Sequence, residues 1–580
     1  MGMVKHRAGA SSRVIAKASA DPFYASVLMR YGAEHLEAAG FFDDGAPVGC
    51  DISKAVDDRL LVTPIIKICD AINEVGAESN KPIAVLVTSG GFCPIHNGHL
   101  AMMESARLEV EKRGWRVVGG FFAPDHDGYV RTKCGEEALS GAERTHLARL
   151  ATSESTWLDV DPWAALYLGR AVNYTDIVRR LSRYLSLHLG QSIEIFFVCG
   201  GDNAGFSKAF LDHGRIVIVP RAGTGGEALL DPLAARSERV FVARDHTPNA
   251  IASRVIRKGR AGGLPPKVSQ ELCALQAIKV PTKVDLFLRD EEAWSTDGWS
   301  ARIGVDLEWA QRAFVGSLST ILERAFRRRM PHATVSVTRV SLSEQRRRMD
   351  GVIDRSHHPV ISLDACIDGD HSIAISRRFN VTSGERLSGI FPRPGSADLS
   401  VEIAAIPDGS YLLMDDDIAT GRTIREVCEL LPQRIHIEGV ISVQEVCEGV
   451  SLRTVECSAG EALVEAGDVR DFLVGSHEGG LVARLPSGAI ARVPYLLPYV
   501  QNSRRMSVPL EEEVALSQEL WELNRQFFKS LPVALTIGDC PAAFQALALE
   551  IGFSSSSTME AFCAWHCEQM RSSDRASRCS

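Results

Sequence analysis

Two histidines, His96 and His99, follow a glycine-rich loop that starts at Gly90 and Gly91, directly after the apolar run 83–87. This order predicts a strand, a loop and the start of a helix. Residues three apart on a helix share one face, and the first turn carries free backbone N–H groups and a partial positive charge. Because glycine lets the backbone approach anionic oxygens closely, the segment favours a nucleoside triphosphate. The chemistry that suits it is nucleotidyl transfer.

A second group of chemically capable residues lies in the segment 411–424, where an apolar run leads into three aspartates and then a Thr-Gly loop. Backbone N–H groups and the hydroxyls of Thr420 and Thr423 suit a 5-phosphate at a helix start. The carboxylates of Asp415 and Asp416 suit two ribose hydroxyls. The alternative is an acidic helix cap with calcium-like character, which lacks further oxygen ligands at the required spacing.

The apolar runs that carry these motifs predict two α/β domains. Short apolar runs alternating with helical segments indicate a parallel sheet covered on both faces. The first series comprises the runs 83–87, 117–122, 193–198, 216–219 and 240–242, and the second comprises 334–340, 360–363, 411–414, 440–443 and 472–474. We therefore expect a helical extension at 1–80, α/β domains at 81–285 and 286–515, and a helical extension with a mobile tail at 516–580.

The composition is that of a globular protein. The chain has 580 residues, 45% of them hydrophobic and 24% charged, with a net charge of -9 that gives no footprint for general nucleic-acid binding. No apolar stretch approaches the roughly 20 residues of a membrane span, and residues 1–20 have no apolar signal core. We expect a soluble cytoplasmic protein with no membrane partner.

The 14 cysteines are scattered, which fits reduced thiols better than a disulfide framework. One local group near the end, Cys563, His566 and Cys567, has the residue types of a zinc site but lacks a matching second pair. Buried packing is therefore the favoured role for these residues.

The fragments that follow the first motif resemble, in order and spacing, nicotinamide mononucleotide (NMN) adenylyltransferases of the HxGH nucleotidyltransferase superfamily. The resemblance covers roughly residues 83 to 280, and its further fragments are 118–124, 156–163, 199–202, 220–223 and 251–257. It implies a Rossmann-like domain in which His96 and His99 act on the ATP phosphates. The implied ATP-binding residues are Gly90, Gly91, Phe92, His96, His99, Gly200, Asp202, Ser253 and Arg257, and the implied mononucleotide-binding residues are Trp163, Lys133 and Arg221.

Each implied role has an ordinary structural alternative. Trp163 would stack on the nicotinamide ring, which suits an aromatic face, or be a buried core residue. Asp202 would meet the adenosine ribose or cap a helix, and these roles are compatible. Arg221 and Arg257 would contact phosphate or be solvated charges. The position of Trp163 at a strand end favours the ligand role.

Four positions depart from the family pattern. Gly91 stands where the family usually has Ser or Thr, and Cys93 where Asp or Asn is usual. Ala252 and Arg254 replace hydroxyl residues in the late fragment. Because each change removes a hydrogen-bonding group, reduced activity or a changed nucleotide stays an open alternative.

The 411–424 segment resembles the phosphoribosyl pyrophosphate (PRPP) loop of type I phosphoribosyltransferases, over roughly residues 330 to 500. The matching acidic pair and Thr-Gly-x-Thr pattern imply a PRPP-binding set of Asp415, Asp416, Ala419, Thr420, Gly421, Arg422 and Thr423. The loop 364–370 would lie on the pyrophosphate side, and 471–475 on the base side. The resemblance implies a second Rossmann-like domain that transfers phosphoribosyl from PRPP to a nucleobase, whose identity stays open.

Together the two resemblances imply a bifunctional enzyme of nucleotide and dinucleotide synthesis. A base and PRPP would give a mononucleotide, which ATP would convert to NAD or an analogue, with His96, His99, Asp415 and Asp416 as catalytic residues. Mg²⁺ is expected as cofactor, carried largely by substrate oxygens, so no protein metal ligand is named. Two alternatives remain: a drifted first domain beside an active phosphoribosyltransferase, and a second domain that senses PRPP or a nucleotide. The oligomeric state stays open, with a homo-oligomer among the alternatives.

Overall fold

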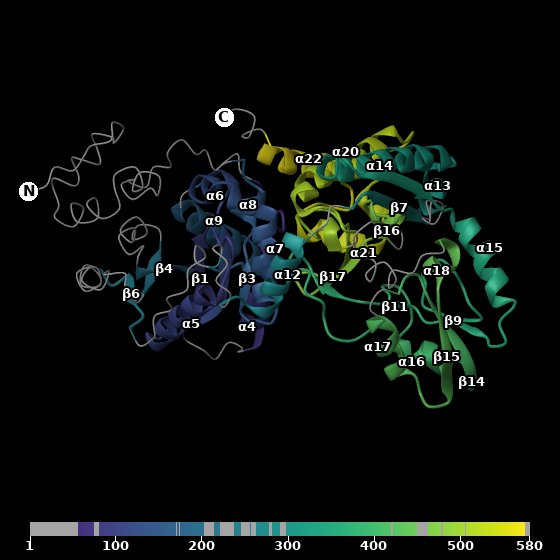
Figure 1. The fold of residues 1–580 in the computed structure, drawn as a ribbon, viewed down its shortest axis with the longest axis horizontal. Helices are drawn as coiled ribbons and strands as arrows, with labels where there is room; N and C mark the ends of the chain where they lie inside the picture. The colour runs from purple at the N-terminus through teal and green to yellow at the C-terminus, as the bar shows by residue number, and fades with distance from the viewer. Residues whose placement is uncertain are drawn as a thin grey trace, which may run out of the picture. The chain divides into compact units, whose positions relative to one another are not determined.

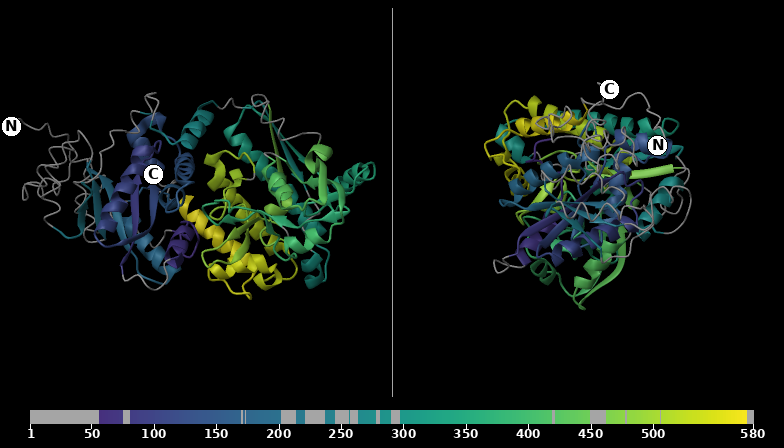
Figure 2. Two further views of the ribbon diagram at one scale, coloured as in Figure 1. Left: turned by 90° about the horizontal axis from the view of Figure 1, so that it is seen from below. Right: turned by 90° about the vertical axis from the view of Figure 1, so that its left-hand side faces the viewer.

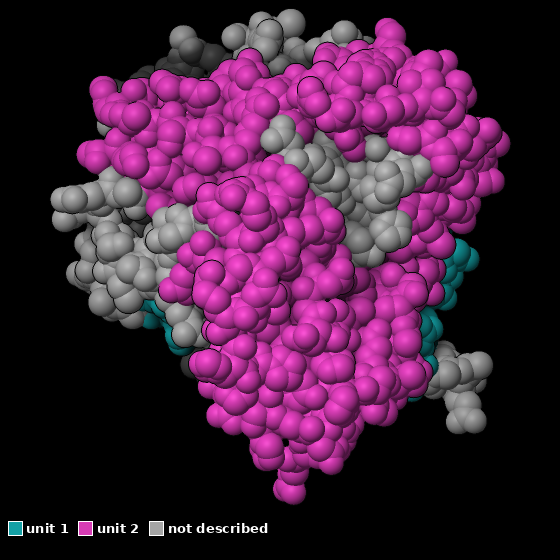
Figure 3. All heavy atoms as spheres, turned by 90° about the vertical axis from the view of Figure 1, so that its right-hand side faces the viewer, with its two compact units in different colours: residues 1–274, 572–580 teal, residues 275–571 magenta. Residues whose placement is uncertain are grey.

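The computed structural model divides the chain into two compact units, which Figure 3 shows in different colours. Unit 1 comprises Met1–Ala274 with Ser572–Ser580, and unit 2 comprises Leu275–Arg571. The structure describes residues 56–74, 81–169, 171–172, 174–201, 214–220, 237–244, 256, 263–277, 281–289, 297–418, 421–448, 462–476, 479–504 and 506–574. Among these residues, no helix combines the length and apolar character that crossing a membrane requires.

Unit 1 is built on a six-stranded sheet whose strand order is β3-β2-β1-β4-β5-β6 (Figure 1). Every neighbouring pair is parallel. The strands are β1 (Ile83–Gly90), β2 (Arg116–Pro124), β3 (Leu158–Val160), β4 (Glu194–Gly200), β5 (Arg215–Val219) and β6 (Val240–Val242). Because consecutive residues of β1 and β2 are buried, both faces of the sheet must be covered by other elements. The predicted α/β architecture with a parallel sheet is confirmed.

The strand order reverses next to β1, because the chain runs from β1 outward to β2 and β3 and then returns to β4 on the other side. In parallel sheets, ligands bind beyond the carboxyl ends of the strands at such a reversal. The helices of unit 1 are α4 (Ile66–Glu74), α5 (Asn97–Lys112), α6 (Asp127–Cys134), α7 (Gly141–Thr152), α8 (Trp163–Leu166), α9 (Tyr174–Leu189) and α12 (Pro266–Ala277), with the short η3 (Gly135–Glu137).

Residues 56–74 are packed into unit 1, although the sequence suggested only an extension. Leu60, Leu61 and Val62 are buried, and α4 lies against β2 at Gly119. A Cβ atom at Gly119 would come within 2.6 Å of the Ile68 side chain, so the glycine permits this close approach.

Unit 2 contains two larger parallel sheets (Figures 1 and 2). The first has the order β16-β7-β8, and the second has the order β10-β9-β14-β15. The strands are β7 (Lys283–Arg289), β8 (Thr334–Arg339), β9 (Val360–Ser362), β10 (His371–Ser372), β14 (Gly409–Asp415), β15 (Ile435–Ser442) and β16 (Ala462–Asp468). The expected domain boundary at 285 falls inside β7, which pairs with strands of unit 2.

Smaller elements complete the framework of unit 2. The minor sheets are formed by β11 (Ile375–Ser376) with β13 (Phe391–Pro392), and by β12 (Phe379–Asn380), β17 (Leu481–Arg484) and β18 (Ile490–Val493). The helices are α13 (Asp297–Ile303), α14 (Glu308–Arg329), α15 (Leu342–Ile353), α16 (Leu399–Ala404), α17 (Arg422–Leu430), α18 (Val443–Glu448), α20 (Glu513–Ser530), α21 (Ala542–Glu550) and α22 (Met559–Asp574), with the 3-10 turns η5 (Val469–Asp471), η6 (Asn502–Arg504), η7 (Leu510–Glu512) and η8 (Ile537–Asp539).

The predicted strand 472–474 is wrong. These residues form a turn directly after η5, and their backbone groups bond to one side chain instead of a strand ladder. Asn524 of α20 donates from Nδ2 to the Phe472 carbonyl at 2.9 Å and accepts from the Val474 N–H at 2.8 Å. The backbone conformation of residues 472–474 is therefore determined by a side chain that is distant in the sequence.

The C-terminal group Cys563, His566 and Cys567 is core packing. His566 stacks on Trp521 with ring centroids 4.0 Å apart. Its Nδ1 lies 2.7 Å from the Phe562 carbonyl, and its Nε2 lies 2.6 Å from the Tyr499 hydroxyl. Burial lowers the pKa of His566 to about 3. Since both ring nitrogens are engaged, this histidine is unsuited to bind zinc.

Candidate functional site

The two histidines of the first motif lie where the sequence predicts, at the start of α5 and after the loop that follows β1. His96 is the N-cap, and its Nδ1 accepts a hydrogen bond from the Gly98 N–H at 3.1 Å. The Nδ1 of His99 accepts from the His96 N–H at 3.2 Å. The two rings are stacked, with centroids 3.7 Å apart and planes 22° apart. The pair thus forms a reciprocal cap on the helix.

This capping arrangement determines the tautomer of both rings. A nitrogen that accepts a backbone N–H cannot itself carry a proton, so the hydrogen-bond network assigns the proton of each neutral ring to Nε2. Each ring then supplies an Nε2–H donor near the positive end of the helix dipole. The arrangement can stabilise negative charge on a phosphate.

The loop before the histidines is shaped by Phe92, whose φ of 40° lies in the left-handed region. Its ring packs edge-on against His99 at 5.0 Å and against Phe122 at 5.4 Å. A Cβ atom at Gly91 would lie 3.7 Å from Val130, an ordinary contact, so this position has room for a side chain. The departure from the family pattern at Gly91 is therefore not imposed by packing.

Cys93 faces protein and is buried. Its Sγ accepts from the Leu139 N–H at 3.3 Å and lies 3.8 Å from the Glu137 carbonyl. Cys93 therefore ties the loop after β1 to the segment that joins η3 to α7.

Arg144 of α7 holds the same corner together, and sequence reasoning missed it. The side chain is 0% exposed. Its guanidinium donates to the Gly91 carbonyl at 3.0 Å and to the Asp125 carbonyl at 2.7 Å, and it pairs with Asp127 at 2.7 Å. The loops after β1 and β2 are thereby fixed to one cation. The available signal was the Ser140–Glu143 capping box, which predicts the helix start but not this role.

Asp125, directly after β2, is a second residue that the sequence did not single out. It is 8% exposed, and its Oδ1 accepts from the Ser89 hydroxyl at 2.5 Å. Its Oδ2 is buried and has no hydrogen-bond partner among the described residues. Burial raises the pKa of the Asp125 carboxyl, although the Ser89 hydrogen bond and the charges of Arg144 and Lys133 oppose this shift.

Trp163 lies at the start of α8, directly beyond β3, and is 1% exposed. The Arg180 guanidinium lies over its ring at 5.4 Å from the centroid. Its Nε1 is buried without a hydrogen-bond partner among the residues that the structure describes. The stacking role of Trp163 stays a prediction, and the geometry adds an indole N–H as a further polar atom.

A buried network of hydrogen bonds and an ion pair positions the backbone at Trp163. Asp161 accepts from the Trp163 N–H at 3.2 Å and from the Thr63 hydroxyl at 2.6 Å. Arg180 pairs with Asp161 at 3.2 Å, and Tyr184 donates to the Thr63 carbonyl at 2.9 Å. The segment 56–74 thus helps to position the strand end that carries the tryptophan.

The other predicted residues of unit 1 are only partly described. Gly200 ends β4, the strand next to β1 on the side opposite β2, and Lys133 is exposed on α6. The remaining predicted positions lie outside the described residues; they are Asp202, Arg221, Ala252, Ser253, Arg254 and Arg257. Their roles stay predictions.

The acidic segment of unit 2 also lies at the carboxyl edge of a parallel sheet. Asp415 ends β14, which pairs with β9 in parallel through Met414 and Ser362. The loops after these two strands, 364–370 and 416–421, therefore leave the same edge. In the first, the Asp364 carboxylate accepts from the Cys366 and Ile367 N–H groups at 2.6 and 2.7 Å. The predicted pyrophosphate-side loop and acidic pair are neighbours.

The carboxyl groups of this edge resist ionisation. Loss of hydration raises the pKa of Asp415 to about 7; Asp417 adds to the shift and Arg377 opposes it. Loss of hydration, followed by the negative charge of Asp417, holds the pKa of the Asp416 carboxyl well above its usual range. A bound cation or a hydroxyl donor would relieve this crowding of negative charge.

Arg289 at the end of β7 compensates part of that charge, and the sequence did not single it out. It pairs through Nη2 with Asp468 at 2.9 Å, Asp417 at 3.5 Å and Asp416 at 3.7 Å. The strand ends of both larger sheets of unit 2 meet at this guanidinium. Arg289 lies closest to Asp468 and opposes the shift that burial imposes on the pKa of Asp416.

The predicted phosphate loop is described in part. Gly421 adopts a left-handed conformation with φ of 66° and precedes α17, where Arg422 pairs with Glu426 at 2.8 Å. Thr423 lies in the first turn of α17, while Ala419 and Thr420 are outside the described residues. The geometry places Gly421 and Thr423 at a helix start as predicted.

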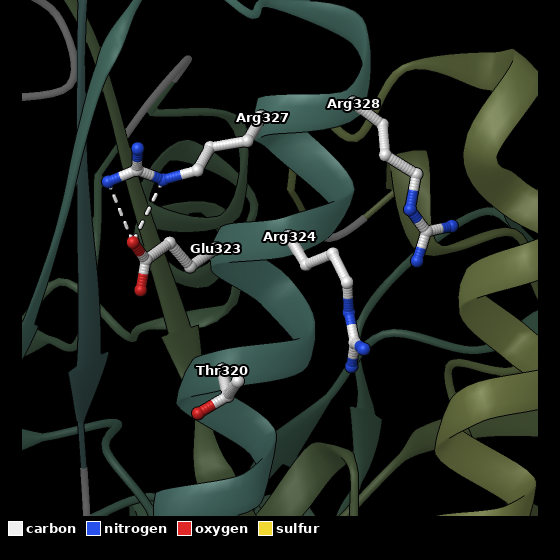
Figure 4. Close-up of a pocket in the computed structure, with 5 residues that line it drawn as sticks. All are labelled: Thr320, Glu323, Arg324, Arg327 and Arg328. Carbon is white, nitrogen blue, oxygen red and sulfur yellow. Dashed lines mark hydrogen bonds and ion pairs between the residues drawn. The ribbon is translucent and has the colours of Figure 1, made fainter.

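A depression on α14, with a volume of about 430 Å³, is a poor ligand site (Figure 4). Its lining residues are Thr320, Glu323, Arg324, Arg327 and Arg328. All three arginines are held in ion pairs, with Glu323 of the same helix or with Glu512 and Glu519 near α20. The depression is a solvated surface between ion-paired side chains.

The comparison with known families concerns unit 1. Residues 87–259 match the family model described as cytidylyltransferase-like. A nicotinamide/nicotinic acid mononucleotide adenylyltransferase of Oryza sativa subsp. japonica is 36% identical over 131 residues, which are 22% of this chain and 51% of that protein. The enzyme of that name from Arabidopsis thaliana is 26% identical over 210 residues, which are 33% of this chain and 86% of that protein.

A further relative, nicotinamide/nicotinic acid mononucleotide adenylyltransferase 2 of Xenopus tropicalis, is 39% identical over 89 residues, 15% of this chain and 27% of that protein. The chain thus spans about half of the rice protein and about a quarter of the frog protein. Unit 1 is thus similar over residues 87–259 to the cytidylyltransferase-like family, and the chain is similar in part to nicotinamide/nicotinic acid mononucleotide adenylyltransferases. The matched residues include both histidines and the strand ends that surround them.

Proposed function

We propose that unit 1 transfers an adenylyl group from ATP to NMN or a related mononucleotide, giving NAD or an analogue and pyrophosphate. The observation that carries this proposal is the stacked histidine pair at the start of α5, with both Nδ1 atoms occupied by backbone N–H groups. The names of the relatives support the choice of substrate.

The reaction needs positioning and charge stabilisation more than a protein nucleophile. An oxygen of the mononucleotide 5′-phosphate attacks the α-phosphorus of ATP, a new P–O bond forms, and the bond to the pyrophosphate oxygen breaks with its electron pair. The Nε2–H groups of His96 and His99 would donate to the triphosphate oxygens as negative charge builds up on them. Arg144 keeps the two adjoining loops in place but is a positioning residue.

The proposal includes Mg²⁺ as an ion that is bound to ATP. Within the described ranges, no group of three His, Cys, Asp or Glu side chains could hold a metal ion. We expect the ion to be carried largely by substrate phosphate oxygens and water, where it neutralises charge.

The test follows NAD and pyrophosphate from purified protein with ATP, Mg²⁺ and NMN. His96→Ala removes one preorganised donor, so we expect kcat/KM to fall at least about a hundredfold. His332→Ala changes an exposed histidine of unit 2 and serves as the control. Absence of NAD from the wild-type protein, or equal activity of the wild type and His96→Ala, would refute the proposal.

We also propose that unit 2 binds PRPP and transfers its phosphoribosyl group to a base. The supporting observation is the neighbouring position of the loops 364–370 and 416–421 at one sheet edge, together with the crowded carboxyl groups of Asp415 and Asp416. These groups would hold the ribose hydroxyls while pyrophosphate leaves the anomeric carbon. A chain with both activities would make a mononucleotide and then adenylylate it.

A panel of nucleobases with PRPP and Mg²⁺, read by mass spectrometry, tests the second activity. Asp416→Asn should abolish mononucleotide formation, whereas Asp408→Asn, at the opposite end of β14 and exposed, should not. PRPP binding without turnover would favour the regulatory alternative. If the protein forms a mononucleotide but no dinucleotide, the result would favour the alternative of an active phosphoribosyltransferase beside a first domain that has drifted.

A further inference from the structure

Asp468 of unit 2 joins groups that belong to both larger sheets. It ends β16 and is the register partner of Arg289, which ends the neighbouring strand β7. The Asp468 side chain is 4% exposed, and its two oxygens lie next to two different arginines. Oδ1 lies 2.9 Å from Nη2 of Arg289, and Oδ2 lies 3.4 Å from Nη2 of Arg470. Because both arginines are buried, salt screens these ion pairs only weakly.

The guanidinium of Arg289 contacts Asp468 and also the acidic loop that follows β14. Its Nη2 is 2.9 Å from Asp468 but 3.5 Å from Asp417 and 3.7 Å from Asp416. A charge-assisted N–H···O bond measures about 2.7–2.9 Å, so only Asp468 lies within that range. The Asp416 side chain is 31% exposed, whereas that of Asp468 is 4% exposed. A ligand therefore has access to Asp416 rather than to Asp468.

Arg470 holds the second oxygen of Asp468. It lies two residues after Asp468, in η5, and its guanidinium also contacts the thiol of Cys366 in the loop 364–370. Asp468 is therefore fixed by its place at a strand end and by a second cation. It would stay at the end of β16 if Arg289 moved toward the acidic loop.

We propose that Asp468 is a positioning residue that holds Arg289 back from Asp416 and so leaves that carboxyl group available to a sugar hydroxyl of PRPP. At 3.7 Å the cation offsets part of the negative charge of Asp416 without occupying its oxygens. Without the charge of Asp468, the guanidinium would close onto the acidic loop and compete with the sugar. This inference rests on the proposed binding of PRPP by unit 2.

The experiment measures the dissociation constant of PRPP by calorimetry, with the full-length protein and Mg²⁺. Asp468→Asn keeps the side-chain size but removes the charge, so we expect PRPP to bind about tenfold more weakly, as for the loss of one hydrogen bond to a charged group. Asp468→Glu keeps the charge and should stay close to the wild type. Asp285→Asn is the control, because it lies toward the other end of β7 and pairs with the exposed Lys283.

The double variant Asp468→Asn/Arg289→Met distinguishes positioning from a merely structural role. Because it also removes the competing cation, we expect it to bind PRPP more tightly than Asp468→Asn alone. If Asp468 only stabilised the fold, the two losses would add and the double variant would be the weaker binder. That result, or wild-type affinity in a folded Asp468→Asn protein, would overturn the inference.

Two further outcomes keep the inference separate from phosphoribosyl transfer. If Asp468→Asn does not fold, Arg289→Met decides alone: it should bind PRPP about as well as the wild type, and a loss of about tenfold or more would overturn the role. A wild-type protein that binds PRPP but forms no mononucleotide would remove the transfer activity, while the measured affinities still decide the role of Asp468. A wild-type protein that does not bind PRPP would remove both.

Discussion

The buried guanidinium of Arg144 allows a quantitative test of how the two loops at the sheet edge are held. Arg144→Met keeps much of the side-chain volume but removes the donors to the carbonyls of Leu139, Gly91 and Asp125. Each buried carbonyl left without a donor costs about 1 kcal/mol. The loss of the ion pair with Asp127, which is 29% exposed and regains water, adds about 1 kcal/mol. We expect unit 1 to lose about 4 kcal/mol of stability.

Hydrogen exchange read by mass spectrometry suits this measurement, because a chain of two units is not expected to unfold in one step. The N–H of Asp125, which bonds to the Gly90 carbonyl, reports directly on the affected corner. A change of 4 kcal/mol corresponds to about a thousandfold faster exchange where opening controls the rate. Lys267→Met of α12 breaks an ion pair with Glu154 whose side chains are 50% and 84% exposed, and we expect its effect to stay below about 1 kcal/mol.

The result that would refute this reasoning is a small effect. If Arg144→Met changes exchange in the two loops no more than Lys267→Met does, the four contacts of the guanidinium do not hold the corner. Exchange in β15 of unit 2 should be unchanged in both proteins, which separates a local effect from a general loss of folding.

Three further predictions follow from particular contacts. Thr63→Val should destabilise unit 1 by about 1 to 2 kcal/mol in thermal unfolding, because it removes the buried hydroxyl that donates to Asp161; Thr320→Val on the surface of α14 should change little. Since the folded-state pKa of Asp415 is raised to about 7, the proton bound in the folded state stabilises unit 2 below about pH 4, and this contribution is lost as the pH rises to about 7. Asp415→Asn should therefore raise the melting temperature of unit 2 at pH 8 but not at pH 4, and an equal rise at both would contradict the assignment. Gly91→Ser should fold normally, because its Cβ meets Val130 at an ordinary 3.7 Å, and should lower the KM for ATP severalfold in the NAD assay; an unchanged KM would show that this position does not face phosphate.

The parallel sheet of unit 1 was predictable because its strands are continuous apolar runs that end in glycine-rich corners. The start of α5 was predictable because the glycines, the histidines and the helical spacing are all local in the sequence. The acidic edge of unit 2 was predictable for the same reason. These are features in which residues act through near neighbours along the chain.

The strand predicted at 472–474 failed because Asn524, about 50 positions later, satisfies the backbone of that turn. The role of Arg144 could not be predicted either, because one of its partners, Gly91, lies 53 positions away. Arg289 meets Asp417 across 128 positions. Buried charged residues of this kind have no sequence pattern of their own.

The sequence by itself determined the residue types that could act on phosphates and the strand ends on which they lie. Only the tertiary structure decided which tautomer His96 and His99 adopt, which cation holds the loops, and that Asp125 and Trp163 share one edge. The physical reason is that burial and long-range hydrogen bonds determine the protonation and orientation of a side chain, and both depend on segments far apart in the chain.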